Sequence, residues 1–435
     1  MPKLWDKGVD DEEVEQYSVW GDHVIDQAML PYDLIGSVAH AKAIHKAKFI
    51  TTAELNKLLV GLKDIYALWK KDKIEVKQEH EDCHTTIELY LTEKYGQVGK
   101  KIHVGRSRND QSTCMIRLYE KDMLLKTAKE CISLVEVLLA FSKKHEKTVM
   151  PGFTHMRQAM PSSFGLWSEA FAEALLNDLD MVKNAFKLIN QNALGFAASY
   201  GTTLPIDRNY TASLMGFPKV MNVLHGANSR GKFEAAVIHS LHQVMLTLGR
   251  MAAILAMWTM PEFNYVILPD KLTTGSSIMP QKHNPDVLEM MRGMSAHVQG
   301  HYIAVSSSVK DLLSGYNRDT QLNKIGLKDS FEMTISSLRM MQRVIKEMKV
   351  DKKRCWDDCL PELWATQEAY DLVNKGMPFR EAYQQVAKSI GQVKKPSHPK
   401  VPPLKTSSLK KQLKQEHTLL ERELQKWHKV KGLLE

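Results

Sequence analysis

The stretch "LWSEAFAEALLNDLDMVKNAFKLINQNAL", residues 166–194, contains neither glycine nor proline. Its apolar side chains recur at intervals of three and four residues, so they share one face of an α-helix. These residues are Phe171, Leu175, Leu179, Val182, Phe186 and Ile189. Because no helix breaker interrupts the pattern, the helix can run beyond the usual three turns. The stretch predicts a long amphipathic helix with one buried face.

Three other stretches, residues 118–139, 237–251 and 287–309, carry apolar residues at the same helical spacing. No comparable stretch alternates apolar and polar residues as a half-buried strand does. Long amphipathic helices bury their apolar faces against one another and, side by side, form a bundle. We therefore predict an all-α fold built around a bundle of long central helices.

The character of the sequence changes near residue 393. Residues 393–403, "VKKPSHPKVPP", are rich in proline and lysine and indicate an extended linker. A charged helix is expected to follow, with Ser407 or Ser408 as its N-cap. We find no internal repeat in the chain.

The composition is that of a globular protein, with 435 residues, 43% hydrophobic and 25% charged. The five cysteines are irregularly spaced, which favours reduced thiols over disulfides or a metal site. The acidic N-terminus lacks the apolar region of a signal peptide, and the most apolar run, residues 244–260, is interrupted by Arg250. We expect a cytoplasmic protein that does not associate with membranes.

The formal net charge is +9, and much of the excess lies in the C-terminal tail. We find no nucleic-acid-binding motif, so nucleic acid is an unfavoured partner. An anionic small substrate explains a basic protein equally well.

The segment "HVGRSRNDQ", residues 103–111, concentrates hydrogen-bond donors where a helix is expected to begin. Gly105 permits a tight turn, and Ser107, Arg108 and Asn109 follow it directly. Backbone N–H groups and the helix dipole both favour an anion at such a position. The segment therefore indicates a carboxylate or phosphate site. The alternative is a helix cap with solvated arginines.

The segment "MPGFTHMRQAMP", residues 150–161, places Thr154 and His155 just after a Pro-Gly pair, where we expect a turn. A histidine can handle protons or bind a carboxylate, although a lone histidine is more often structural. Both interpretations stay open for His155.

The loop "TTGSSIMPQKHNPD", residues 273–286, is flexible near its glycine and stiff near its two prolines. A C–H beside a carboxylate is weakly acidic, and a serine can remove that proton only as a stabilised alkoxide. Close backbone amides around Ser276 and Ser277, with the positive charge of Lys282, would supply that stabilisation. Asn284 would add donors that fix the substrate. The position alone does not choose between the two serines.

The same loop resembles the signature of the fumarase/aspartase superfamily, G-S-S-x-M-P-x-K-x-N-P. Within that superfamily the chain most resembles the argininosuccinate lyases over roughly residues 3–390. The matching segments, in order, are "LPYDLIGSVAHA", "EDCHTTIE", "GRSRNDQ", "MPGFTHM", "GTTLPIDR", "PEFNYVILPD" and "YNRDTQ".

The resemblance implies an all-α protein in three domains, for which we expect residues 1–105, 106–350 and 351–435. It implies a homotetramer whose helical core builds each active site from three subunits. It also implies β-elimination of argininosuccinate to arginine and fumarate, a step of arginine biosynthesis. No metal or organic cofactor is implied.

The resemblance also implies residue roles. Ser276 would be the base, while Lys282 and Asn284 would hold the carboxylate. His155, with Thr154, would bind substrate and assist proton traffic. The residues expected to line the site are His84, Ser107, Arg108, Asn109 and Ser277. Those expected at the amino-acid end of the substrate are Asp33, Tyr316, Arg318, Gln321 and Lys324.

The largest departure from the family pattern is "NVLHGANSRGKF", residues 222–233. Arg230 is kept, but His225, Asn228 and Gly231 stand where the family has Asp, Ser and Asp. The change in charge leaves two alternatives open. The chain could act on another N-substituted aspartate, or it could be a non-catalytic structural protein.

Overall fold

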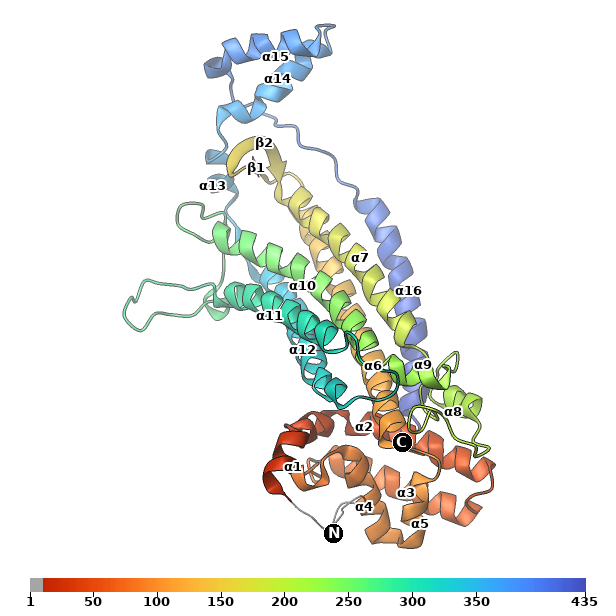
Figure 1. The fold of residues 1–435 in the computed structure, drawn as a ribbon. Helices are drawn as coiled ribbons and strands as arrows, with labels where there is room; N and C mark the ends of the chain where they lie inside the picture. The colour runs from red at the N-terminus through yellow and green to blue at the C-terminus, as the bar shows by residue number, and fades with distance from the viewer. Residues whose placement is uncertain (1–10) are drawn as a thin grey trace.

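The computed structural model describes residues 11–435, and its body is a bundle of long helices (Figure 1). They are α6 (Arg108–Lys144), α7 (Phe164–Ile189), α10 (Lys232–Trp258), α11 (Asp286–Ser308) and α12 (Asn323–Glu347). Within the bundle α6 packs against α7 and α12, and α10 packs against α7, α11 and α12. The apolar stripe of α7 is buried at Leu175, Leu179, Val182 and Ile189. The all-α prediction is confirmed.

A second group of helices covers one end of the bundle (Figure 1). They are α1 (Glu12–Val19), α2 (Asp22–Lys46), α3 (Thr52–Trp69), α4 (Cys83–Tyr95) and α5 (Gln97–Lys100). Helix α2 contains Pro31, which has no N–H to donate to the carbonyl of Gln27. The indole N–H of Trp69 donates to that carbonyl instead, at 2.8 Å. The helical hydrogen-bond ladder is therefore interrupted in the middle of α2.

Two short antiparallel pairs depart from the expectation that no segment would be a strand. They are β1 (Val149–Thr154) with β2 (Arg157–Ser163), and β3 (Val266–Ile267) with β4 (Lys349–Val350). The first is a hairpin with a register irregularity near Gly152, which breaks the alternation that would have marked it. The expected Pro-Gly turn is wrong, because Pro151 and Gly152 lie inside β1. The turn is at His155 and Met156.

The chain between the long helices and after them adds smaller elements. The helices are α8 (Arg208–Leu214), α9 (Val223–Asn228), α13 (Lys352–Asp357), α14 (Ala365–Val373) and α15 (Phe379–Lys388). The 3₁₀ turns are Gln78–His80, Lys101–His103, Asp270–Leu272, Arg318–Gln321, Pro361–Trp364 and Ile390–Gln392. Helices α14 and α15 pack on each other around a small separate core that includes Trp364 and Ala382.

The last helix, α16 (Thr406–Lys431), runs back along α6 and α7 to the far end of the bundle (Figure 1). Neither Ser407 nor Ser408 caps it, which corrects the expectation from the sequence. The Lys405 N–H and the Thr406 hydroxyl both donate to the Glu169 carboxylate, at 2.6 and 2.7 Å. A side chain from α7 thus anchors the start of α16. The domain boundaries stay a prediction, and within 351–435 α16 shares the core of the bundle.

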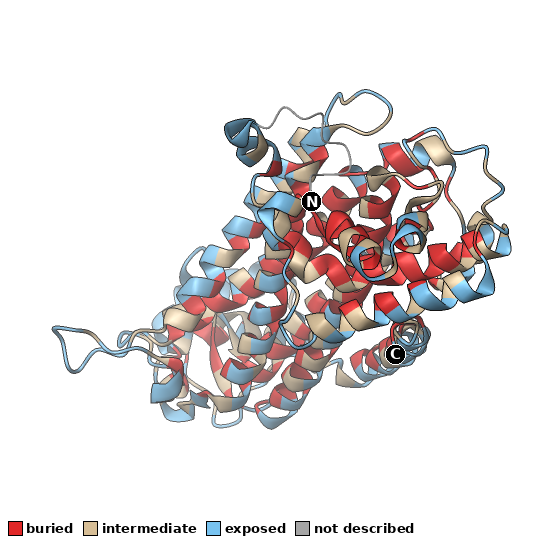
Figure 2. Ribbon diagram, turned by 90° about the horizontal axis from the view of Figure 1, so that it is seen from below, coloured by how far each residue is buried: buried red, intermediate tan, exposed pale blue. Residues whose placement is uncertain are grey.

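Buried residues run through the bundle and through the helices at its end (Figure 2). Among residues 11–435, one helix, α10, has the length and apolar composition to cross a membrane. It packs inside the bundle, and core helices of helical proteins meet the same criteria. All five cysteines are buried free thiols. Residues 1–10, on which the expectation of no signal peptide partly rests, lie outside the described part.

Candidate functional site

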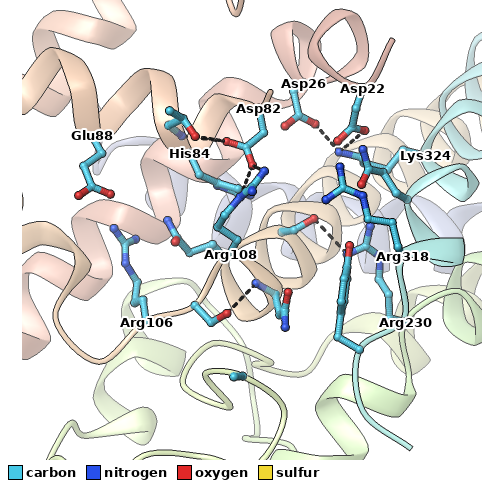
Figure 3. Close-up of a pocket in the computed structure, with 18 of the residues that line it drawn as sticks. Asp22, Asp26, Asp82, His84, Glu88, Arg106, Arg108, Arg230, Arg318 and Lys324 are labelled. Atoms are coloured by element: carbon cyan, nitrogen blue, oxygen red, sulfur yellow. Dashed lines mark hydrogen bonds and ion pairs between the residues drawn. The ribbon is translucent and has the colours of Figure 1, made fainter. Parts of the chain in front are cut away.

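A polar cavity of about 640 Å³ lies where the N-terminal helices meet the bundle (Figure 3). Side chains from α2, α4, α12 and the start of α6 line it, with others from the segment before α12. Eight residues expected in the site meet here: His84, Ser107, Arg108, Asn109, Tyr316, Arg318, Gln321 and Lys324. Segments that are far apart in the sequence therefore form one polar pocket.

The start of α6 forms one wall of this cavity. Gly105 has a φ of 69°, which glycine adopts readily, and it turns the chain into the helix. Ser107 is the N-cap, and its hydroxyl accepts the Asn109 N–H at 3.3 Å. The Asp110 carboxylate accepts the Ser107 N–H at 2.9 Å, which completes a capping box. The N–H groups of Ser107 and Asn109 are therefore bonded within the cap, while these residues line the cavity wall.

The arginines here are not solvated caps. Arg108 bonds to the Asp82 carboxylate, and its Nη2 lies 3.0 Å from Glu81 Oε1. The buried Arg106 donates from Nη1 to the Ser37 hydroxyl at 3.0 Å. These contacts fix both guanidinium groups, so the alternative of solvated arginines does not hold.

His84 in α4 faces the same cavity and is buried. Its Nδ1 lies 2.9 Å from Asp33 Oδ2. Burial alone would lower the pKa of His84, but the charges of Asp33 and Asp82 outweigh it and raise the pKa. Burial likewise opposes ionisation of Asp82, yet His84 and Arg108 lower its pKa to about 2. His84 is therefore held towards its cationic form, which suits a carboxylate ligand.

Asp33, expected to contact substrate, does not line the cavity. It lies behind His84, and it acts on the cavity through that ring. Its contact with substrate stays a prediction, and in the structure Asp33 holds the ring of a residue that lines the cavity.

Lys324 lies at the other end of the cavity, between two carboxylates of α2 (Figure 3). Its Nζ is 2.5 Å from Asp22 Oδ1 and 2.6 Å from Asp26 Oδ1. Burial raises the pKa of Asp22 to about 6, although the Lys324 charge opposes this. The sequence analysis missed both aspartates. Their spacing of four residues, which puts them on one helical face, is the signal that could have found them.

One group of side chains in the described part could hold a metal ion by its geometry. The potential ligand atoms of Asp26, Cys83 and His84 lie within 4.8 Å of one another. Asp26 already pairs with Lys324, and Nδ1 of His84 already bonds to Asp33. A cation would have to displace the ammonium group, so these residues fit a hydrogen-bonded wall better than a metal centre.

The serine loop lies elsewhere, projecting from the bundle before α11 (Figure 1). Backbone N–H···O bonds between Thr274 and Asn284, at 3.0 and 2.8 Å, close its neck. The Ser276 hydroxyl accepts the N–H groups of Ile278 at 3.3 Å and Met279 at 3.1 Å. The other expected loop residues, Ser277 and Lys282, stand in the same exposed segment.

Thr154 and His155 lie in a third place, at the tip of the β1–β2 hairpin. This tip is at the opposite end of the bundle from α2 and α4 (Figure 1). Both turn residues, His155 and Met156, have positive φ, at 50° and 60°. Such φ values are strained for residues other than glycine and concentrate at functional sites. Within one chain, the cavity, the serine loop and the hairpin stay apart.

The divergent segment 222–233 reaches the cavity through two residues. Arg230 lines the cavity, and its Nη1 donates to the Ser112 hydroxyl at 3.0 Å. The Asn228 side chain accepts the Gly315 N–H at 2.8 Å, next to Tyr316 of the cavity wall. Arg230 is kept from the family pattern, so Asn228 is the departure that contacts the segment beside the pocket.

Comparison with known proteins gives a consistent result. A family model described as "Lyase" matches residues 9–300. The argininosuccinate lyase of Thermotoga neapolitana is 39% identical over 394 residues, which cover 90% of this chain and 99% of that protein. That of Parabacteroides distasonis is 38% identical over 390 residues, which cover 89% and 87%.

Solved structures share the fold. EDDS lyase in complex with formate aligns with a TM-score of 0.83 at 22% identity, covering 98% of this chain and 95% of that one. The class II fumarase of Schistosoma mansoni aligns with a TM-score of 0.70 at 17% identity, covering 85% and 89%. These likenesses establish the architecture, while the sequence matches establish kinship. The chain is a carbon–nitrogen lyase that belongs to the argininosuccinate lyase family of the fumarase/aspartase superfamily.

Proposed function

We propose that this protein cleaves argininosuccinate into arginine and fumarate by β-elimination, with Ser276 as the base. The observation that carries the mechanism is the pair of N–H groups, from Ile278 and Met279, that donate to the Ser276 hydroxyl oxygen. Two donors aimed at one oxygen lower the cost of its alkoxide form. Lys282 of the same loop supplies a positive charge.

The elimination proceeds in two steps in this scheme. Ser276 removes a proton from the carbon beside a carboxylate, and the electron pair moves into that carboxylate to form a dianion. Lys282 and Asn284 stabilise the dianion. The electron pair then returns to form the C=C bond of fumarate, and the C–N bond breaks. The leaving nitrogen takes up a proton, a transfer that His155 assists.

The cavity would hold the two ends of the substrate with two different groups of lining residues. His84, Ser107 and Asn109 offer a cation and hydrogen-bond donors to carboxylates. Lys324, Gln321 and the aspartates of α2 offer charges of both signs to the amino-acid end. A dicarboxylate with a cationic extension complements this distribution of charge.

We propose that a homotetramer assembles the complete site from three chains. The separation of cavity, loop and hairpin within one chain supports this. The test is to refold a mixture of the Ser276→Ala and His84→Gln variants. We expect each variant alone to be inactive and the mixture to recover part of the activity. Failure to recover activity in mixed tetramers would contradict shared sites.

The direct test of the reaction follows the absorbance of fumarate when the purified protein is given argininosuccinate. We expect turnover without added metal. Turnover of neither argininosuccinate nor any other aspartate adduct would instead favour a structural protein.

A second candidate is a lyase for another N-substituted aspartate. It is favoured by the contact of Asn228, because this departure from the family pattern binds the Gly315 N–H, next to Tyr316 of the cavity wall. Turnover of a different amine adduct of fumarate, without turnover of argininosuccinate, would select this candidate.

A further inference from the structure

The C-terminal helix ends on a buried carboxylate of α6. Asp122 is 6% exposed, and the indole N–H of Trp427 in α16 donates to its Oδ1 at 2.5 Å. The hydroxyl of Tyr32 in α2 donates to its Oδ2 at 2.7 Å. Burial would raise the pKa of Asp122, but Lys126 and the Tyr32 hydrogen bond, with Lys431, lower it. Both donors therefore bond to a charged carboxylate, and such hydrogen bonds are stronger than those between two neutral groups.

The aromatic rings at this point form a continuous row. The Trp427 ring stacks on Tyr32, with centroids 6.4 Å apart and planes at 12°. Tyr32 meets Tyr119 edge-on at 5.5 Å, and Tyr119 meets Phe331 edge-on at 5.8 Å. The four rings come from α16, α2, α6 and α12. Three of these helices, α2, α6 and α12, also carry residues of the polar cavity.

Helix α2 depends on the contact between Tyr32 and Asp122 more than a helix with an uninterrupted hydrogen-bond ladder would. Pro31, immediately before Tyr32, leaves the hydrogen-bond ladder interrupted. Asp33, immediately after Tyr32, bonds to the His84 ring that faces the cavity. With the ladder weakened, side-chain contacts must fix this part of α2, and the Tyr32–Asp122 bond is a buried one.

We propose that Trp427 is a positioning residue for the cavity: by docking α16 on Asp122 and Tyr32, it fixes α2 so that Asp33 holds His84 towards the ligand. Of the three residues in this contact, Trp427 lies in the C-terminal helix, while Asp122 and Tyr32 belong to α6 and α2. The kinetic test of this proposal rests on the proposed function, because it uses the KM for argininosuccinate to detect a change in the cavity.

The kinetic test compares two variants of α16. Trp427→Phe keeps an aromatic ring but removes the donor to Asp122. Glu416→Gln is the matched control: Glu416 is also buried and pairs with Lys183 at 2.7 Å, about 16 Å further up the same helix. We expect Trp427→Phe to raise KM about fivefold to tenfold, with kcat within about twofold, because ground-state binding is what changes. Glu416→Gln should leave both constants near those of the unmodified protein.

Tyr32→Phe repeats the test from the other side, because it removes the second donor to Asp122 and keeps the ring. It should raise KM in the same way, and it serves if Trp427→Phe fails to fold. Unchanged KM in both ring-conserving variants would overturn the proposal. An equal rise of KM in Glu416→Gln would also overturn it, since any loosening of α16 would then suffice.

Amide hydrogen exchange gives a readout that does not need activity. We expect faster exchange in residues 28–40 of α2 for Trp427→Phe than for Glu416→Gln. Equal exchange in the two variants would contradict the positioning role. If the unmodified protein fails to turn over argininosuccinate, the proposed function is wrong, and the exchange comparison then decides the role of Trp427 by itself.

Discussion

Lys324 in α12 and Asp26 in α2 are 298 positions apart in the chain, and their Nζ and Oδ1 atoms are 2.6 Å apart. Asp22 of the same helix lies at 2.5 Å from the same ammonium group. All three side chains are buried. The contact joins the N-terminal helices to the bundle where the cavity forms, so stability and the proposed ligand binding share these charges.

Replacement of Lys324 by methionine should therefore destabilise the fold. It leaves two buried carboxylates without their counter-charge, a change that typically costs about 3–5 kcal/mol. Urea unfolding followed by circular dichroism measures it. Lys328→Met is the control, because Lys328 pairs with Glu332 on the surface of the same helix and should cost at most about 0.5 kcal/mol. Equal losses in the two variants would contradict the account.

Ser276→Ala should remove the base and lower kcat about a thousandfold, with the fold unchanged. Ser277→Ala should lower kcat far less, since the hydroxyl that accepts the Ile278 and Met279 N–H groups belongs to Ser276. Steady-state kinetics of the two variants distinguish the serines. A larger loss in Ser277→Ala would transfer the role of base to that residue.

The stability of the protein should depend on His84 in a defined pH range. Its pKa is raised in the folded state, because Asp33 and Asp82 outweigh the effect of burial. The resulting stabilisation is complete below the ordinary value of 6.5 and is lost as the pH rises through the folded pKa. Asp26 of α2 adds a further negative charge facing the ring.

The measurement is a series of urea titrations of the unmodified protein and His84→Gln between about pH 5.5 and pH 9. The stability difference between them should shrink as the pH rises. A difference that stays constant over this range would show that the imidazole is not held in its cationic form.

Met156→Gly should stabilise the β1–β2 hairpin, because Met156 has a φ of 60° that glycine adopts without strain. The gain should be about 0.5–1 kcal/mol after the greater chain entropy of glycine is counted. Thermal unfolding measures it. His155→Asn, which also tolerates positive φ, should preserve the hairpin and reduce turnover. Loss of the hairpin in both variants would contradict this separation of roles.

The sequence predicts the bundle well because its signal is local and repeated. The stripe that includes Leu175 and Val182 needs only the helical period, and both residues are buried. The hairpin was missed because Pro151, Gly152 and a register irregularity break the strand alternation. The N-cap of α16 was misplaced because its acceptor, Glu169, comes from another helix.

The candidate site was predictable in its residue types but not in its grouping. The residues from Ser107 to Asn109 are adjacent in sequence, and they line the cavity. Asp22 and Asp26 carry no motif, and their importance appears only when α12 brings Lys324 between them. Asp33 is one residue from Tyr32, and only tertiary packing decides that it lies behind His84.

The return of α16 along the bundle has a consequence for the order of folding. Helix α2 leaves the ribosome long before Trp427 of α16 is added, because five long helices lie between them in the chain. Domains generally begin to fold as they emerge. The carboxylate of Asp122 therefore lacks its indole donor until α16 has been made, and a nascent chain that stalls before α16 appears holds α2 loosely.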